Sequence, residues 1–300
     1  MRTLRLGTRG SLLARTQSGH VATALHKATD WPVELVIIKT TGDRVTDRPL
    51  LEVGGKGLFT KELEDALLNG AIDFAVHSMK DMPTEMPAGL VIAAVPERVN
   101  PLDGLVGCAL ADLQPGAIVG TGSVRRALQL RALRPDLEIR GIRGNVGTRV
   151  QKQRDGGYDV VVLAMAGLTR LGKADVVSET LTVAKMVPAC GQGALAIQAR
   201  EDDPEILPLL EALHHEPTAI CVAAERAFLE AVSGGCSAPA ACHAWLDGDW
   251  IVAEAVWAPA EHSPARRLRS RSDFLHATPL GRDLAHRLQA GEGEPLLPLQ

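Results

Sequence analysis

Residues 4–27 have the sequence LRLGTRGSLLARTQSGHVATALHK, in which a short extended segment passes through a glycine-rich turn into a helical pattern. Residues 4–8 indicate a strand, and residues 11–27 indicate a helix. The signals that follow are extended at 33–39, helical at 58–68 and extended at 72–77. This alternation predicts an α/β domain built on a mostly parallel sheet.

The same alternation resumes after a polar segment that is bracketed by Pro96 and Pro101. Two prolines around polar residues favour an extended linker, so we expect a domain boundary there. The later signals are strands at 117–120, 137–142 and 158–164 and helices at 124–133 and 146–154. They predict a second α/β domain of similar size.

A second cluster of breaker residues, 188–193, predicts that the chain crosses between domains again. A helix is expected at 218–232, where apolar residues recur at helical spacing and Thr218 can cap the first turn. The remaining signals are strands at 240–246, 250–257 and 267–272, a helix at 280–288 and a frayed tail after Gly291. These elements indicate a small α+β domain.

The composition is that of a globular protein with about two domains by length, since the 300 residues are 46% hydrophobic and 23% charged. These fractions exclude a disordered or low-complexity chain. The formal net charge of −4 supplies no global positive field, so neither a nucleic acid nor an anionic membrane is expected as a partner. If the protein binds an anion, a local cluster of positively charged side chains must bind it.

The longest apolar run, Val160–Leu168, is far shorter than the roughly 20 residues that a membrane span needs. Arg5 interrupts the apolar residues at the N-terminus, which therefore lack the continuous core of a secretion signal, and we expect a cytoplasmic location.

The five cysteines are widely spaced and form no C-x-x-C pair. Their spacing favours neither a disulfide framework nor a metal site.

Two glycine-rich turns, Gly7–Ser11 and Gly120–Ser123, each follow an expected strand and open an expected helix. The free backbone N–H groups and the positive end of the helix dipole at such a turn can bind an anion. The same residues are equally typical of ordinary turns and helix caps. The turns alone therefore leave both interpretations open.

Arginine is concentrated in one window, because seven of the chain's 24 arginines lie between residues 125 and 149. A guanidinium group pairs with two oxygens of a carboxylate or phosphate, so this window predicts a small polyanionic ligand. Arg125 and Arg126 lie at a helix start, where a cation opposes the helix dipole, and they need a ligand or another partner. Arg131 and Arg134, late in the same helix, are more typical of solvated charges.

Three loops carry further candidate groups. Asp81 follows Lys80 after an expected strand and could transfer a proton, although the local sequence Asp-Met-Pro favours a plain turn. Cys236 lies in a Gly-Gly loop and is a candidate nucleophile or attachment point, although a lone loop cysteine is more typically inert. Lys56, in the glycine cluster 54–57, belongs either to a mobile lid or to a plain surface loop.

Together these segments resemble the porphobilinogen deaminase family. The motifs that match occur in the family's order: Gly7-Thr8-Arg9 with Ser11, residues 53–62, 77–83, 119–126 and 143–149, Gly191–Ala194, and Gly234-Gly235-Cys236 with Pro239. The resemblance implies an α/β fold with two lobes like those of periplasmic binding proteins around a cleft, plus a small α+β C-terminal domain. We therefore expect domains at 1–96 with a return segment 194–214, at 97–193, and at 215–300, where Cys236 lies.

The resemblance also implies the chemistry, which is the stepwise joining of four porphobilinogen molecules, with loss of ammonia, into linear hydroxymethylbilane. Cys236 would hold a dipyrromethane cofactor through a thioether, and Asp81 would transfer the protons. The residues that match the family's cofactor-binding positions are Ser78, Lys80, Thr121, Ser123, Arg125 and Arg126. Those that match its substrate-binding positions are Arg9, Ser11, Lys56, Arg143, Arg149 and Gln192. The resemblance implies no metal, and we expect a monomeric enzyme.

Two other functions compete with this one. A non-catalytic carboxylate- or phosphate-binding protein would use the same lobes and arginines without a covalent adduct, and the expected absence of an export signal counts against it. A nucleic-acid-binding protein that used residues 125–149 would bind oligonucleotides with a steep salt dependence, which the net negative charge disfavours.

Overall fold

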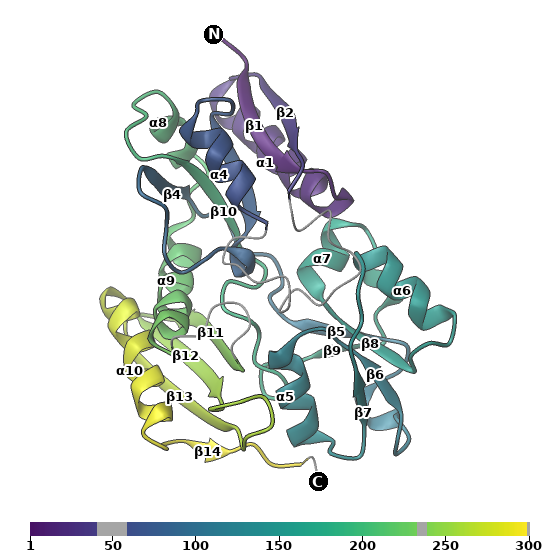
Figure 1. The fold of residues 1–300 in the computed structure, drawn as a ribbon. Coiled ribbons are helices and arrows are strands. Elements are labelled where there is room, and N and C mark those ends of the chain that lie inside the picture. The colour runs from purple at the N-terminus through teal and green to yellow at the C-terminus, as the bar shows by residue number, and fades with distance from the viewer. Residues whose placement is uncertain (41–58, 233–238, 299–300) are drawn as a thin grey trace. The chain divides into compact units, whose positions relative to one another are not determined.

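The computed structural model describes residues 1–40, 59–232 and 239–298 (Figure 1). Contacts between Cα atoms divide the chain into two compact units. The first unit comprises Met1–Arg98 with Ala194–Ala219, and the second comprises Val99–Gly193 with Ile220–Gln300. The chain therefore leaves the first unit and later returns to it, while the boundaries of three separate domains stay a prediction.

The first unit is built on a five-stranded sheet in the order β2-β1-β3-β10-β4. Its strands are β1 (Leu4–Arg9), β2 (Val33–Ile38), β3 (Phe74–Ser78), β4 (Leu90–Ala94) and β10 (Leu195–Arg200), and its helices are α1 (Leu12–Thr29), α4 (Lys61–Leu68) and α8 (Ile206–Glu211). Only β10 runs antiparallel to its neighbours in this sheet. Successive residues point to opposite faces, so Phe74 packs in the cluster with α1 and α8 whereas Ala75 packs with α4.

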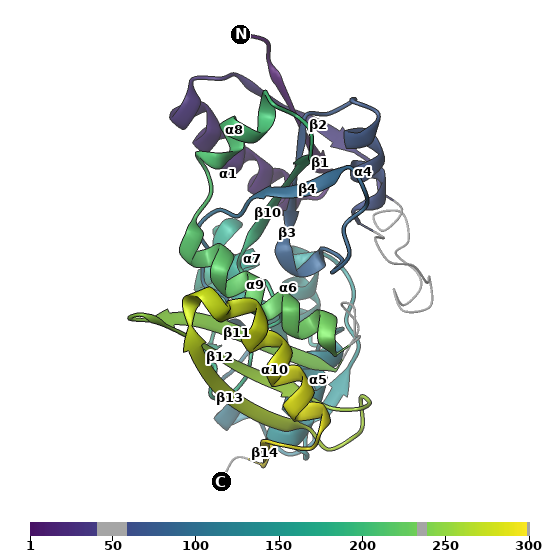
Figure 2. The same cartoon turned by 90° about the vertical axis from the view of Figure 1, so that its left-hand side faces the viewer.

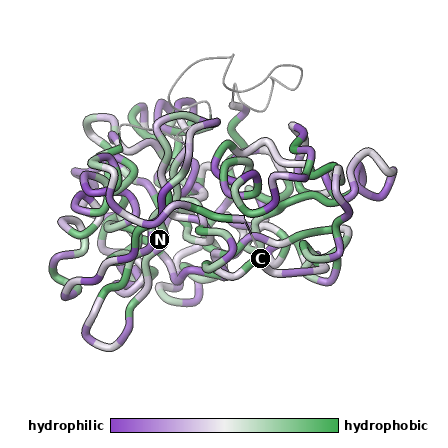
Figure 3. Tube along the Cα trace, turned by 90° about the horizontal axis from the view of Figure 1, so that it is seen from below, coloured by the Kyte–Doolittle hydropathy of each residue, from purple (hydrophilic) through white to green (hydrophobic). Residues whose placement is uncertain are grey.

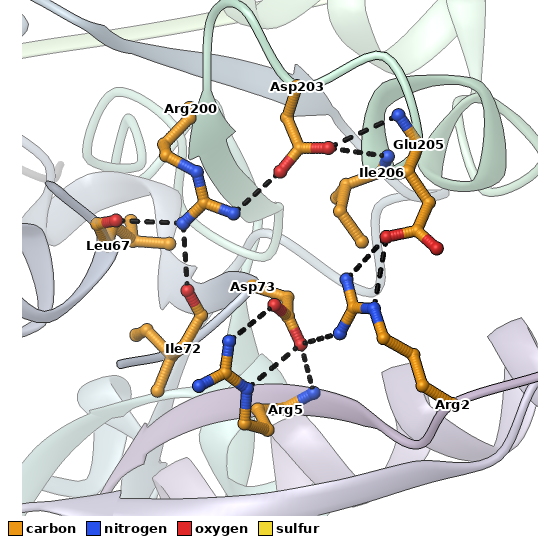
Figure 4. Close-up of polar contacts among 9 residues, drawn as sticks. All are labelled: Arg2, Arg5, Leu67, Ile72, Asp73, Arg200, Asp203, Glu205 and Ile206. Carbon is orange, nitrogen blue, oxygen red and sulfur yellow. Dashed lines mark hydrogen bonds and ion pairs between the residues drawn. The ribbon is translucent and has the colours of Figure 1, made fainter. Parts of the chain in front are cut away.

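A buried carboxylate joins the N-terminal strand to the middle of this sheet, as Figure 4 shows. Asp73, beside the start of β3, accepts hydrogen bonds from Arg2 Nη1 at 2.8 Å and from Arg5 Nη2 at 2.8 Å. It also accepts the Arg5 backbone N–H at 2.7 Å. Arg2 in turn pairs with Glu205 at 2.6 Å, beside α8. The network therefore connects the returning segment to β1 and β3.

We expect Asp73→Asn to lower the free energy of unfolding by about 2 kcal/mol, because hydrogen bonds to a buried charge are lost. Burial raises the pKa of Asp73, but the hydrogen bonds from Arg5 and Arg2 outweigh it and place the pKa below its usual value. This stabilisation is present above the unfolded-state pKa and is lost as the pH falls through the lower folded-state pKa. Urea unfolding at pH 7 measures the difference.

Glu205→Gln is the control for this prediction, because the Glu205 side chain is 45% exposed and pairs with the same Arg2. An exposed ion pair contributes well under 1 kcal/mol, so this variant should unfold close to the wild type. Equal unfolding midpoints for Asp73→Asn and Glu205→Gln would contradict the prediction.

The second unit contains another five-stranded sheet, in the order β7-β6-β8-β5-β9. Its strands are β5 (Asp103–Val106), β6 (Ile118–Gly120), β7 (Glu138–Arg140), β8 (Val160–Ala164) and β9 (Glu179–Leu181), and its helices are α5 (Val124–Leu133), α6 (Val146–Arg154) and α7 (Met165–Arg170). Strand β5 runs antiparallel to both neighbours, whereas β6 is parallel to β7 and β8. Leu130 of α5 packs with Val160 on one face, and Val150 of α6 packs with Val161 on the other.

A four-stranded antiparallel sheet follows, and Figure 2 shows α9 and α10 along one of its faces. Its elements are α9 (Glu216–Ala231), β11 (Ala240–Asp247), β12 (Trp250–Trp257), β13 (Arg266–Asp273), α10 (Ala277–Gln289) and β14 (Glu294–Pro295). The helices approach closely at Gly281, where a Cβ atom would lie 2.0 Å from the carbonyl oxygen of Ala224. Short 3-10 helices lie at Met79–Asp81, Leu110–Asp112, Ala174–Val176 and Phe274–His276.

The predicted fold class is confirmed, because two mostly parallel α/β sheets precede a C-terminal sheet covered by helices. The prediction of a frayed tail after Gly291 is wrong: β14 pairs with β13, which satisfies backbone groups at the sheet edge.

In the described part of the chain, no helix has the length and apolarity to span a membrane, and Figure 3 shows hydrophilic residues interrupting the hydrophobic ones throughout. The described residues also contain no group of His, Cys, Asp and Glu side chains placed to hold a metal.

Candidate active site

Arg125 and Arg126, in the first turn of α5, share one buried carboxylate. Asp103, the first residue of β5, accepts Arg125 Nη2 through Oδ2 at 2.8 Å. Its Oδ1 accepts Arg126 Nε and Nη2 at 3.1 and 2.7 Å. The exposed fractions of Asp103, Arg125 and Arg126 are 0, 5 and 6%. The partner that the two arginines need at a helix start is thus an internal carboxylate.

Gln192 joins the same group of side chains from the segment that crosses back to the first unit. It is 1% exposed, and its Nε2 donates to Asp103 Oδ1 at 2.9 Å and to the carbonyl oxygen of Pro101 at 2.6 Å. The structure therefore brings three predicted ligand-binding residues, Arg125, Arg126 and Gln192, to one carboxylate.

We call Arg125, Arg126, Arg143 and Arg149 the arginine cluster, and it carries more positive charge than Asp103 balances. Burial raises the pKa of the Asp103 carboxyl, but the charges of Arg125 and Arg126 outweigh it and hold the pKa well below its usual range. Burial and the charges of Arg126 and Arg143 lower the pKa of Arg149 to about 10. Among the described residues, the buried Nε of Arg125 has no hydrogen-bond partner. Excess positive charge with an unused donor suits an anionic ligand.

The two glycine-rich turns use their hydroxyl groups differently. Ser11 Oγ accepts the N–H of Ala14 at 3.3 Å and caps α1, so the cap interpretation is confirmed there. Ser123 holds the N-cap position of α5 without a side-chain cap bond, and its N–H donates to Thr121 Oγ1 at 3.2 Å. The Ser123 hydroxyl thus lies at the positive end of α5 without capping it.

Two buried methionines hold the segment that presents Asp81 in the first unit. Met79 and Met82 are 2 and 1% exposed, and the Met82 N–H donates to the Met79 carbonyl oxygen at 3.1 Å. Between these anchors Lys80 is half-buried and Asp81 is exposed. A carboxyl on a short turn with buried ends is held in place yet open to a ligand.

Two more of the predicted site residues, Arg9 and Ser78, contact other side chains of the first unit. The guanidinium carbon of Arg9 lies 4.0 Å from the ring centroid of Phe59, a cation–π contact. Ser78 Oγ accepts Gln17 Nε2 at 3.1 Å. The described predicted residues are therefore divided between the two units. Two predicted residues lie outside the described residues: Lys56 and Cys236.

The sequence assigned no role to the half-buried Arg170 or to the buried His77. Burial lowers the pKa of Arg170 to about 10, and its Nη2 donates to the carbonyl oxygen of Gly193 at 2.8 Å. His77, on β3, is 6% exposed, and burial lowers its pKa to about 4, with Gln198 raising it and Arg9 lowering it further. Their positions in the sequence could have drawn attention to both residues. His77 directly precedes the Ser-Met-Lys-Asp segment, and Arg170 ends a helix that follows a buried strand.

The neutral His77 makes stability depend on pH. We expect the free energy of unfolding to fall by about 2 kcal/mol from pH 7 to pH 5, because the unfolded imidazole binds a proton below about pH 6.5. The folded imidazole stays neutral until the pH nears 4, so this contribution is lost between those two values. Denaturant unfolding of the wild type and of His77→Asn at pH 7, 6 and 5 measures it.

His262→Asn is the control for this series, because His262 is exposed and its removal should leave the pH dependence of unfolding unchanged. The prediction is wrong if His77→Asn loses as much stability as the wild type between pH 7 and pH 5.

The chain matches two family models along most of its length. The model described as porphobilinogen deaminase, dipyromethane cofactor binding domain, matches residues 4–208, and the model of the C-terminal domain matches residues 219–290. A porphobilinogen deaminase of Syntrophobacter fumaroxidans is 45% identical over 293 residues, which cover 96% of this chain and 94% of that protein. One of Nitratidesulfovibrio vulgaris strain Miyazaki F is 46% identical over 308 residues, which cover 99% and 96%.

The solved structures that this chain matches include the methionine-binding protein MetQ. It is 17% identical, with a TM-score of 0.45, and the match covers 82% of this chain and 99% of that chain.

Proposed function

Because this chain belongs to the porphobilinogen deaminase family, we propose that it joins four porphobilinogen molecules head to tail, with loss of ammonia, into linear hydroxymethylbilane. It is a transferase of tetrapyrrole biosynthesis that releases its product by hydrolysis. The observation that carries the proposal is the excess positive charge of the arginine cluster, in which Arg125 and Arg126 share Asp103 and Arg149 interacts electrostatically with Arg126 and Arg143. Each pyrrole carries an acetate and a propionate group, so a growing chain gains negative charge that such a cluster can bind.

The residues present fit a dipyrromethane cofactor with its carboxylates. Arg125 has a buried Nε without a partner among the described residues, and Ser123 offers a hydroxyl at the start of α5. We propose that Cys236 holds the group through a thioether. The residues proposed to bind it are Ser78, Lys80, Thr121, Ser123, Arg125 and Arg126. When bound, the group supplies the pyrrole α-carbon to which the first substrate is joined.

Asp81 moves the protons in the proposed mechanism. Its carboxyl Oδ donates a proton to the amine of porphobilinogen, which leaves as ammonia, and the resulting carboxylate stabilises the substrate cation. The carboxylate then takes up the proton that the attacked α-carbon loses when the new carbon–carbon bond forms, which restores the acid. The residues proposed to bind the substrate carboxylates are Arg9, Ser11, Lys56, Arg143, Arg149 and Gln192.

The proposal is tested by mixing purified protein with porphobilinogen and following substrate consumption, ammonia release and the intact mass of the chain. The enzyme should release one ammonia per substrate consumed and carry a covalent adduct of two pyrroles. A non-catalytic carboxylate-binding protein would bind porphobilinogen without releasing ammonia and would have the mass of the bare polypeptide. That second result, from a host that makes tetrapyrroles, would overturn the proposal.

The proposal also includes a monomeric, cytoplasmic enzyme without nucleic-acid or membrane partners. Light scattering of the purified chain tests the first property, since a dimer would have twice the 31.9 kDa mass of the chain. Fractionation of the source cells tests the location.

A further inference from the structure

Asp103 touches the two guanidinium groups of α5 through different oxygens. Its Oδ1 accepts two N–H groups of Arg126, and its Oδ2 accepts one N–H group of Arg125. Gln192 adds a further donor to Oδ1. A fully buried carboxylate loses its hydration, and only several charged donors offset that loss. The buried carboxylate of Asp103 therefore depends on this pair of arginines for its charged donors.

Each guanidinium group is held along a second edge as well. Arg125 Nη1 donates to the carbonyl oxygen of Val187 at 2.7 Å, and Arg126 Nη1 donates to that of Val162 at 2.9 Å. The main chain at Asp103 is itself fixed, because β5 pairs with β8 on one side and β9 on the other. A planar guanidinium held along two edges has one orientation, so its remaining N–H groups point in defined directions.

We propose that Asp103 is a positioning residue for the reaction, because it bridges Arg125 and Arg126 and orients their remaining N–H groups for the carboxylates of the pyrrole ligands. One carboxylate between two guanidinium groups leaves the three groups with a net positive charge, which an anionic ligand can neutralise. Asp103 acts through the arginines and touches no reacting atom. This inference rests on the proposed function.

The chain contains a matched control for this inference. Asp73 also bridges two arginines, Arg2 and Arg5, and its side chain is 2% exposed (Figure 4). Those arginines are not among the predicted ligand-binding residues. Arg2 and Arg5 are 41 and 37% exposed, whereas Arg125 and Arg126 are buried. Asp103→Asn and Asp73→Asn therefore make the same chemical change at two buried carboxylates that each bridge two arginines, and only the arginines at Asp103 are assigned to ligand binding.

The experiment compares the wild type, Asp103→Asn, Asp103→Glu and Asp73→Asn. It measures the KM for porphobilinogen, the kcat per chain that carries the adduct, the adduct-bearing fraction from intact mass, and the thermal midpoint. We expect Asp103→Asn to raise KM roughly tenfold and to lower the adduct-bearing fraction, because the guanidinium groups lose their orientation. The kcat per loaded chain should change less than about twofold, since Asp81 and its surroundings are intact. Asp73→Asn should lower only the thermal midpoint.

Two results would overturn the inference. An unchanged KM and adduct-bearing fraction in Asp103→Asn would make Asp103 a purely structural ion-pair partner like Asp73. A lowered KM would mean that its carboxylate merely competes with the ligand for the arginines. If Asp103→Asn does not fold, Asp103→Glu decides: it keeps the charge, but its extra methylene displaces the guanidinium groups, so KM should still rise. A wild type that consumes no porphobilinogen would instead count against the proposed function, before any variant is compared.

Discussion

Asp81→Asn should lower the rate of porphobilinogen consumption at least about a hundredfold while leaving the covalent adduct in place. Asparagine has the shape of aspartate but neither donates nor accepts the proton that the reaction moves, and a positioned acid–base group contributes about 10²–10⁴-fold. Its exposed position on the short turn between Met79 and Met82 means that the substitution removes no packing. Initial rates and intact mass on the same sample measure both effects.

Asp112→Asn is the matched control for Asp81→Asn. Asp112 also ends a 3-10 helix, Leu110–Asp112, and is also exposed, but it belongs to the second unit and has no predicted role. The control should keep the wild-type rate. A rate of Asp81→Asn within a few-fold of this control would remove Asp81 from the proton-transfer role.

The second large effect is expected at the proposed cofactor anchor. Cys236→Ser should have the mass of the bare polypeptide and no turnover, because a serine hydroxyl is a far weaker nucleophile than a thiolate and forms no thioether. Without the anchored group, no pyrrole α-carbon is available to receive the first substrate. Intact mass and initial rates again measure the outcome.

Cys108→Ser is the control for this substitution, because Cys108 is the partly exposed cysteine of the described residues. Burial raises the pKa of its thiol, so it is a poor nucleophile, and its replacement should leave both adduct and rate unchanged. An adduct that persists in Cys236→Ser would place the anchor on another residue. The described cysteines that would then be tested are Cys108, Cys190, Cys221 and Cys242.

The elements whose signals are local agree most closely with the structure. The predicted helices 124–133 and 146–154 have the observed bounds of α5 and α6, and the predicted strand 250–257 has those of β12. Asn145 caps α6 by accepting the N–H of Thr148 at 2.9 Å. Caps and apolar spacing act within a few residues, so they can be recognised without knowledge of the fold.

Two of the strands that the sequence analysis missed, β10 and β14, have no such local signal. Five of the six residues of β10 are buried, so both faces of the strand are covered. A strand covered on both faces does not need to alternate apolar with polar residues, and the segment lacks the usual strand pattern. It became a strand because β3 and β4 lie on either side of it. The two-residue strand β14 likewise exists only through its pairing with β13.

Sequence alone determined which residue types this protein brings to its chemistry: the concentration of arginines at 125–149, the neighbouring Lys80 and Asp81, and a cysteine in a glycine-rich loop. It also indicated that Arg125 and Arg126 need a partner. Only the tertiary structure decided that this partner is Asp103, and that Arg149 is half-buried and near enough to Arg126 for its pKa to fall. The physical reason is that burial and Coulomb interactions depend on distances in space, and the residues that set them are far apart along the chain.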